Sequence, residues 1–78
     1  MRNTKSSLGR LVVCVENSGY EVSLDKRKIY VSLPDPTAAK SGQIRVIDES
    51  GEHYLYPKTF FLPIRLPQPL RKAVLAAA

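Results

Sequence analysis

The stretch from residue 44 to residue 64 constrains the fold more than any other part of this chain; it reads IRVIDESGEHYLYPKTFFLPI. At its start Ile44 and Val46 share one face of an extended segment, the pattern of a strand with one side turned to a core. The polar segment 48–52 follows, and its Gly51 supplies the left-handed residue that a tight hairpin needs. The stretch therefore predicts a strand, a hairpin and a second strand, followed by one helical turn and a closing strand.

Short apolar runs bounded by glycine, proline and asparagine predict five strands in all. They cover residues 10–16, 29–33, 43–48, 53–56 and 61–64. Residues 17–28 form a long irregular loop, in which we expect Gly19 to take a positive φ. Single helical turns are expected at residues 38–40 and 57–60. Pro63 marks the last strand as an edge strand, because proline cannot donate to a sheet ladder.

Seventy-eight residues make one small domain, and strands of this length and spacing predict a small antiparallel barrel or sandwich. We expect a disordered leader over residues 1–9, a β-barrel domain over 10–66 and a short helix or tail over 67–78. The helix is favoured by the prolines that precede it and by its alanine content. The apolar residues expected to form the core are Leu11, Val13, Val15, Leu24, Ile29, Val31, Leu33, Ile44, Val46, Leu55 and Phe60.

Three segments carry a resemblance to a known group of proteins: VVCVENSGYE, LDKRKIYVSLPD and the hairpin stretch quoted above. Over roughly residues 11–64 the chain resembles short, largely uncharacterised bacterial and phage proteins with Src-homology-3-like barrels. The resemblance implies a mostly β fold, a five-stranded antiparallel barrel with a short C-terminal α-helix, and it implies no activity. Those proteins tend to have Gly-Lys where this chain has Arg27 and Lys28, and a positive φ at that turn would strain an arginine.

Charge is unevenly distributed along the chain, whose net charge is +5. All seven acidic residues lie between residues 11 and 56, so the flanks on both sides are purely basic. Basic flanks suit loose attraction to nucleic acid or to acidic surfaces. The single cysteine excludes an intramolecular disulfide and indicates a reducing compartment, which makes the cytoplasm the expected location. No apolar run approaches the length of a membrane span, so we expect no membrane partner.

The inventory of reactive side chains is small, with one histidine, one cysteine and no phosphate-binding glycine loop. Cys14 lies inside an apolar run and is expected to be a buried small hydrophobe. His53, on a strand beside two tyrosines, is expected to be a surface or half-buried packing residue rather than a catalyst. The carboxylates of segment 48–52 lack the ligand spacing of a calcium loop. We therefore expect no catalytic residue, no metal site and no cofactor, and read the chain as non-enzymatic.

A protein-protein adaptor or a small regulatory subunit is the expected function, and a nucleic-acid-binding protein is the alternative. No small-molecule substrate is implied. The residues proposed to bind a ligand are Tyr20, Lys26, Arg27, Lys28, Tyr30, Tyr54 and Tyr56. The tyrosines would provide a platform for a proline-rich peptide, although the chain lacks the tryptophan usual in such grooves. Leu70 and Val74 would either cover the barrel or meet a partner.

Overall fold

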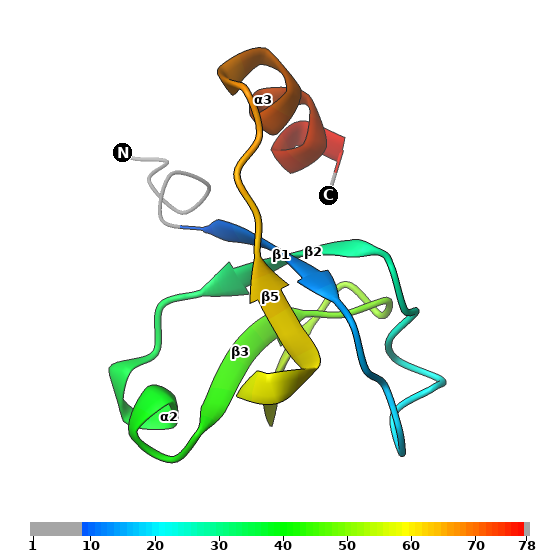
Figure 1. Ribbon diagram of the computed structural model, residues 1–78, viewed down its shortest axis with the longest axis vertical. Coiled ribbons are helices and arrows are strands. Elements are labelled where there is room, and N and C mark those ends of the chain that lie inside the picture. The colour runs from blue at the N-terminus through cyan, green and yellow to red at the C-terminus, as the bar shows by residue number, and fades with distance from the viewer. Residues whose placement is uncertain (1–8, 78) are drawn as a thin grey trace.

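The computed structural model describes residues 9–77 (Figure 1), so the leader expected over residues 1–9 lies outside the described residues except for Gly9. Eight elements follow in order: β1 (Arg10–Cys14), β2 (Ile29–Leu33), α2 (Pro36–Lys40), β3 (Gln43–Ile47), β4 (His53–Pro57), the 3-10 turn η1 (Lys58–Phe60), β5 (Phe61–Pro63) and α3 (Gln68–Ala77). The five predicted strands are confirmed, with ends that differ from the prediction by no more than two residues.

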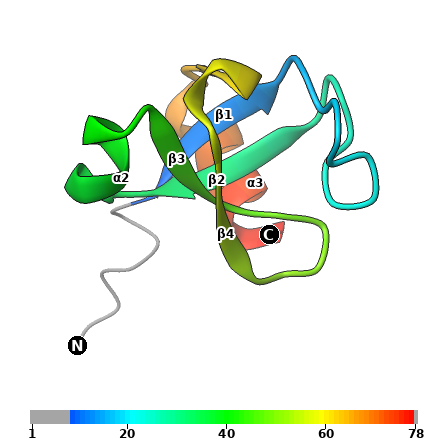
Figure 2. The same cartoon turned by 90° about the horizontal axis from the view of Figure 1, so that it is seen from below.

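The five strands form one antiparallel sheet in the order β4-β3-β2-β1-β5. The chain is thus mostly β with a short C-terminal helix, as expected. Pro63 lies in an edge strand, where a missing backbone donor costs no ladder bond. The closed barrel is not observed: within residues 9–77 no pairing joins β4 to β5, and the sheet stays open. Figure 2 shows α2 at one end of the sheet and the loop 15–28 at the other.

The main core lies on one face of this sheet. Its buried members are Val12, Cys14, Leu24, Tyr30, Val46, Tyr56 and Phe61. On β1 and β2 this is the opposite face from the predicted one: Tyr30 is in the core in place of Ile29 and Leu33, and Val15 is 44% exposed. Likewise Tyr56 is buried in place of Leu55 on β4. The error on β1 has a simple cause: this strand is apolar at nearly every position, so alternation along its sequence cannot distinguish one face from the other.

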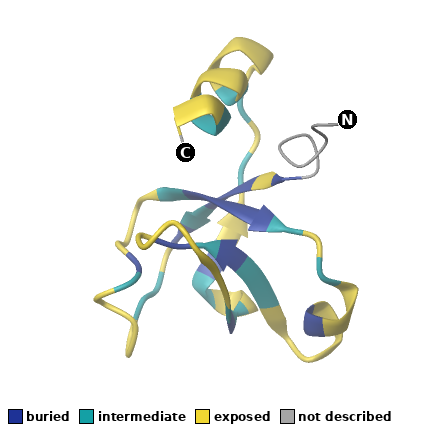
Figure 3. Ribbon diagram, turned by 180° about the vertical axis from the view of Figure 1, so that it is seen from behind, coloured by how far each residue is buried: buried dark blue, intermediate teal, exposed yellow. Residues whose placement is uncertain are grey.

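The second face of the sheet is also partly covered. Leu11 and Val31 pair across β1 and β2 and point away from the main core, yet they are 3% and 9% exposed. Val74 of α3 borders a cleft of about 500 Å³ together with Val31, so the helix lies over this face. The half-buried side of α3 is turned toward the sheet in Figure 3. Leu70, the other residue of the predicted apolar stripe, is 50% exposed.

One residue of the long loop 15–28 is buried in the core. Leu24 is fully buried, and its carbonyl oxygen accepts a hydrogen bond from the Asn17 side chain over 2.9 Å. Gly19 has a φ of 86°, as expected for the turn at this position. Val22, in contrast, is 96% exposed near the tip of the loop. Leu24 is therefore the buried anchor of this loop.

Replacing Leu24 with alanine should lower the free energy of unfolding by about 2–5 kcal/mol, because it removes a fully buried side chain and leaves a cavity. Urea denaturation followed by circular dichroism measures the change. The matched control is Val22→Ala in the same loop, which should change stability by no more than about 0.5 kcal/mol. Equal losses in the two variants would contradict the anchoring role of Leu24.

Arg27 occupies a turn that its side chain type disfavours. Its φ is 69°, in the left-handed region, and its backbone N–H donates to the Cys14 carbonyl over 2.7 Å. The strain that was expected for an arginine at a positive φ is therefore present. The turn persists because the backbone bond to β1 and the burial of Leu24 fix the chain on both sides.

Arg27→Gly should raise the free energy of unfolding by up to about 1 kcal/mol, since relief of left-handed strain exceeds the entropy cost of glycine. The comparison is Lys26→Gly, one residue earlier, where φ is not positive and glycine should lower stability by about 0.5–1 kcal/mol. Thermal unfolding of both variants provides the measurement. A lower melting temperature for Arg27→Gly would show that its side chain contributes more than the strain costs.

Candidate functional site

The seven residues predicted to bind a ligand do not form one surface. Tyr30 and Tyr56 are 5% and 3% exposed and belong to the core. The other five residues of the set are exposed. The set therefore divides into a buried group with a structural environment and an exposed group that a ligand can reach.

Tyr30 is held by the β3–β4 hairpin. Its hydroxyl donates to the Glu49 carboxylate over 2.6 Å and accepts from the Asp25 backbone N–H over 2.7 Å. Burial and the bond to Glu49 raise the pKa of Tyr30 far above its usual value. Lys28 donates to the same carboxylate over 2.6 Å, and this bond is the main cause that lowers the pKa of Glu49. Lys28 is thus already paired with an acid.

Tyr56 has a matching partner on the neighbouring residue of the hairpin. Its hydroxyl donates to Asp48 over 2.5 Å, and burial together with this bond raises the pKa of Tyr56 to about 12. Asp48 also accepts from the Ser50 backbone N–H over 2.9 Å. Burial alone would raise the pKa of Asp48, but the hydrogen bonds from Ser50 and Tyr56 outweigh it and the pKa is lowered. Asp48 is therefore a buried, ionised and fully bonded carboxylate.

These bonds connect the hairpin to the long loop. The Glu49 backbone N–H donates to the Ser23 carbonyl of the loop over 3.1 Å. The Glu49 side chain accepts from Tyr30 of β2, so this one residue joins the hairpin to both the loop and the sheet. Figure 2 shows the loop and the hairpin at the same end of the sheet. Within residues 9–77 no group of three or more His, Cys, Asp or Glu side chains is placed to share a metal ion. The hairpin carboxylates serve the structure.

Stability should fall as the pH drops below about 4, the ordinary pKa of aspartate and glutamate in the unfolded chain. Their pKa values are lowered in the folded state, so the stabilisation is present above the unfolded pKa values and is lost as the pH falls through the folded ones. Glu49→Gln should lower stability at pH 7 by about 1–2 kcal/mol, discounted for its partial exposure, and should flatten the acid limb. Urea denaturation between about pH 2 and pH 7 tests this.

The control for this experiment is Glu21→Gln in the exposed part of the loop. Within the described part of the chain, no hydrogen bond or ion pair of the Glu21 side chain is found. This variant should keep the acid dependence of the wild type. An acid limb unchanged by Glu49→Gln would show that the hairpin carboxylates do not control acid unfolding.

Tyr20 is exposed, yet its ring packs against two other aromatic rings. Its ring centroid lies 5.1 Å from that of Tyr56 and 5.8 Å from that of Phe60, both edge-on. The ring is nevertheless 41% exposed. Within residues 9–77 no hydrogen bond of its hydroxyl is found. We call Tyr20 and Phe60, lying over the buried Tyr56, the aromatic step.

Phe60 was not among the predicted site residues, because its apolar side chain was assigned to the core. It is only partly buried and packs at the margin of the core, on η1. The helical turn predicted over residues 57–60 was the available signal, since such a turn brings a side chain to the end of the sheet. Tyr54 is 50% exposed, and its hydroxyl donates to Glu52 over 2.9 Å.

Lys26 and Arg27 lie on a different surface from the aromatic step. They line a cleft of about 400 Å³ with Val13, Cys14 and Val15. Cys14 is fully buried, and burial raises the pKa of its thiol, so the reactive thiolate is disfavoured. The cleft therefore combines an apolar wall with two exposed cations.

His53 lies at the surface at the start of β4, which is one of the two positions expected for it. Its Nδ1 lies 3.0 Å from the Arg45 guanidinium, which itself binds Asp35 over 2.8 Å. Asp35 also caps α2 by accepting from the Ala38 backbone N–H. The bond from Ala38 and the ion pair with Arg45 lower the pKa of Asp35. This group thus fixes the short helix to β3.

Comparisons of the chain with protein-family models, with curated proteins and with solved structures gave no match. The resemblance to Src-homology-3-like barrels therefore stays a hypothesis. Among the helices of residues 9–77, none is both long enough and apolar enough to cross a membrane.

Proposed function

We propose that the protein is a small non-catalytic protein-binding module, an adaptor or a regulatory subunit, that works in the cytoplasm. We propose further that its sheet is a Src-homology-3-like barrel and that the aromatic step is where it binds a partner. The observation that carries the proposal is the Tyr20 ring, which is rigidly packed and yet 41% exposed.

A ring of this kind suits protein recognition for two reasons. Tyrosine offers a large contact area at a small entropy cost, and it is enriched among the residues that dominate binding energy. The edge-on contacts with Tyr56 and Phe60 already restrict the ring, so little further conformational entropy is lost when a partner binds. Val22, nearly fully exposed on the same loop, adds apolar surface close by.

The barrel assignment is supported by the order of the strands. β1 lies between β2 and β5, the long loop joins β1 to β2, and η1 separates β4 from β5. The resemblance implies the same arrangement, with a long first loop over residues 17–28 and a short helical turn over residues 57–60 before the last strand. The non-catalytic assignment is supported by the way reactive groups are used: Cys14 is buried, and Asp48 and Glu49 are engaged by tyrosines.

Selection from a display library of random peptides of about ten residues tests the proposal. Peptides bound by the wild-type protein should shift the backbone-amide resonances of Tyr20 and Phe60. Tyr20→Ala should weaken their binding by about 30-fold, the effect of removing a 2 kcal/mol hot spot. Fluorescence anisotropy measures the affinity.

Leu62→Ala is the control, because Leu62 is 56% exposed and alternates on β5 with the core residue Phe61, so its side chain points to the other face of the sheet. It should change the affinity by less than about twofold. Thermal unfolding of Tyr20→Ala separates loss of binding from loss of fold, since this ring also packs on Tyr56. A library that yields no peptide whose binding depends on Tyr20 would refute the role of the step.

Nucleic-acid binding remains the second candidate, because Lys26 and Arg27 are exposed beside a cleft and no salt bridge of either is found within residues 9–77. Lys28 differs, being paired with Glu49. A mixed short oligonucleotide should then bind at about 50 mM salt and weaken steeply at about 200 mM. Lys26→Glu with Arg27→Glu should reduce that salt dependence, and binding unchanged by the double variant would exclude this pair.

A further inference from the structure

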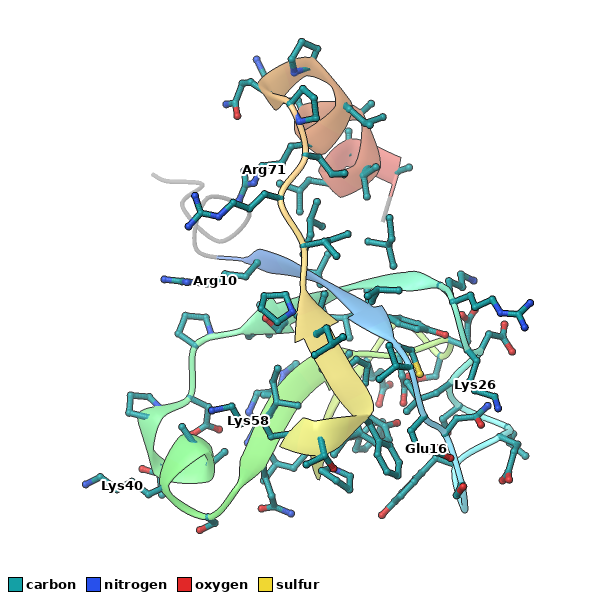
Figure 4. All side chains as sticks on the ribbon, in the orientation of Figure 1. Arg10, Glu16, Lys26, Lys40, Lys58 and Arg71 are labelled. Atoms are coloured by element: carbon teal, nitrogen blue, oxygen red, sulfur yellow. The ribbon has the colours of Figure 1, made fainter. Side chains whose placement is uncertain are left out.

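Three arginines surround a cleft of about 780 Å³ between the sheet and α3, and none of them belongs to the aromatic step. Arg10 comes from β1, Arg65 from the linker after β5, and Arg71 from α3. The apolar residues that line the cleft include Leu11, Ile64 and Leu66. Figure 4 shows Arg10 and Arg71 on the same side of that linker. We call this the arginine cleft.

The cleft is held in shape by hydrogen bonds on both of its sides. The Ile64 backbone N–H donates to the Leu11 carbonyl over 3.1 Å and so fixes the linker against β1. The Arg71 guanidinium donates to the Gly9 carbonyl over 3.0 Å and so fixes α3 against the start of β1. Arg71 has a structural role for this reason, while Arg10 and Arg65 are exposed.

Positive charge in the cleft is not balanced nearby. No carboxylate is among its lining residues, and neither of the two ion pairs found within residues 9–77 involves these arginines. The first turn of α3, which contributes Arg71, carries no acidic residue. The cleft therefore carries unbalanced positive charge, which favours an acidic ligand.

We propose that the arginine cleft binds an extended segment of a partner protein that combines acidic with apolar side chains. Guanidinium groups match carboxylates through paired N–H donors, and they are less strongly hydrated than ammonium groups. Leu11, Ile64 and Leu66 offer apolar surface to the other side chains of such a segment. The volume lies within the range of sites that bind small ligands and short peptide segments.

Other occupants fit less well. Single-stranded nucleic acid stacks its bases on aromatic side chains, and none of the aromatic residues of the chain is among those lining this cleft. Residues 1–8 of the chain itself contain Arg2 and Lys5 and no acid, so their charge opposes entry. The site is also independent of the proposed function, because it shares no residue with Tyr20 and Phe60.

The test uses the random peptide library on the full chain, with Arg10→Glu/Arg65→Glu as the altered protein. Peptides selected by the wild type and retained by Tyr20→Ala should be enriched in both acidic and apolar residues. Their affinity should fall at least about tenfold in the double variant. They should shift the amide resonances of Leu11, Ile64 and Leu66. Arg71 is left unchanged because its guanidinium holds Gly9.

Lys40→Glu/Lys58→Glu is the matched control, with the same change in net charge at α2 and η1, away from the cleft (Figure 4). Affinity within about twofold of the wild type supports a local site. Four results would overturn the proposal. The first is a set of selected peptides without acidic enrichment, and the second is an equal loss of affinity in the control variant. The third is displacement of the peptide by a short oligothymidylate at a lower concentration than the unlabelled peptide itself requires. The fourth is self-association of the protein that the double variant abolishes, which would show that a second copy fills the cleft.

Failure of this test is distinguishable from failure of the proposed function. Binding at the aromatic step depends on Tyr20 and should survive Arg10→Glu/Arg65→Glu. Binding at the arginine cleft should show the opposite dependence. Thermal unfolding of the double variant checks that the fold is intact, which we expect because both side chains are exposed.

Discussion

Two adjacent carboxylates of the β3–β4 hairpin hold the hydroxyls of two buried tyrosines, and the rest of the structure depends on this pair of bonds. Asp48 accepts from Tyr56, which closes the hairpin on β4, and Glu49 accepts from Tyr30, which joins the hairpin to β2. The Glu49 backbone then binds Ser23 in the long loop. Because both tyrosines are buried, the loss of one partner leaves a polar group unpaired, which costs more than an exposed hydrogen bond contributes.

Around these bonds, a short sheet is covered on both of its faces. The main core lies on one side, and α3 with its linker lies over Leu11 and Val31 on the other. A small domain buries a limited fraction of its surface, so cover on the second face adds apolar burial that five short strands alone do not provide. The Arg71 bond to Gly9 helps to keep α3 in place. The same attachment creates the arginine cleft beneath the helix.

The two proposed binding surfaces differ in chemistry as well as in position. The aromatic step presents tyrosine and phenylalanine supported by the core, while the arginine cleft presents cations around aliphatic side chains. Sequence reasoning identified Tyr20 as a candidate but grouped it with Tyr30 and Tyr56, whose rings are buried. It did not identify the arginine cleft, because Arg10 is far in the sequence from Arg65 and Arg71 and lines the same cleft only when β1, the linker and α3 pack together.

The sequence by itself determined the strands, the hairpin and the turns, since these depend on local alternation and on residues such as Gly51 and Pro63. It also predicted that Arg27 would be strained if its turn required a positive φ, which is the case. Only the tertiary structure decided which face of β1 joins the main core, because a strand that is apolar at nearly every position carries no alternation to read. The sheet order and its open edges were likewise decided by long-range pairing, and so were the partners of the tyrosine hydroxyls.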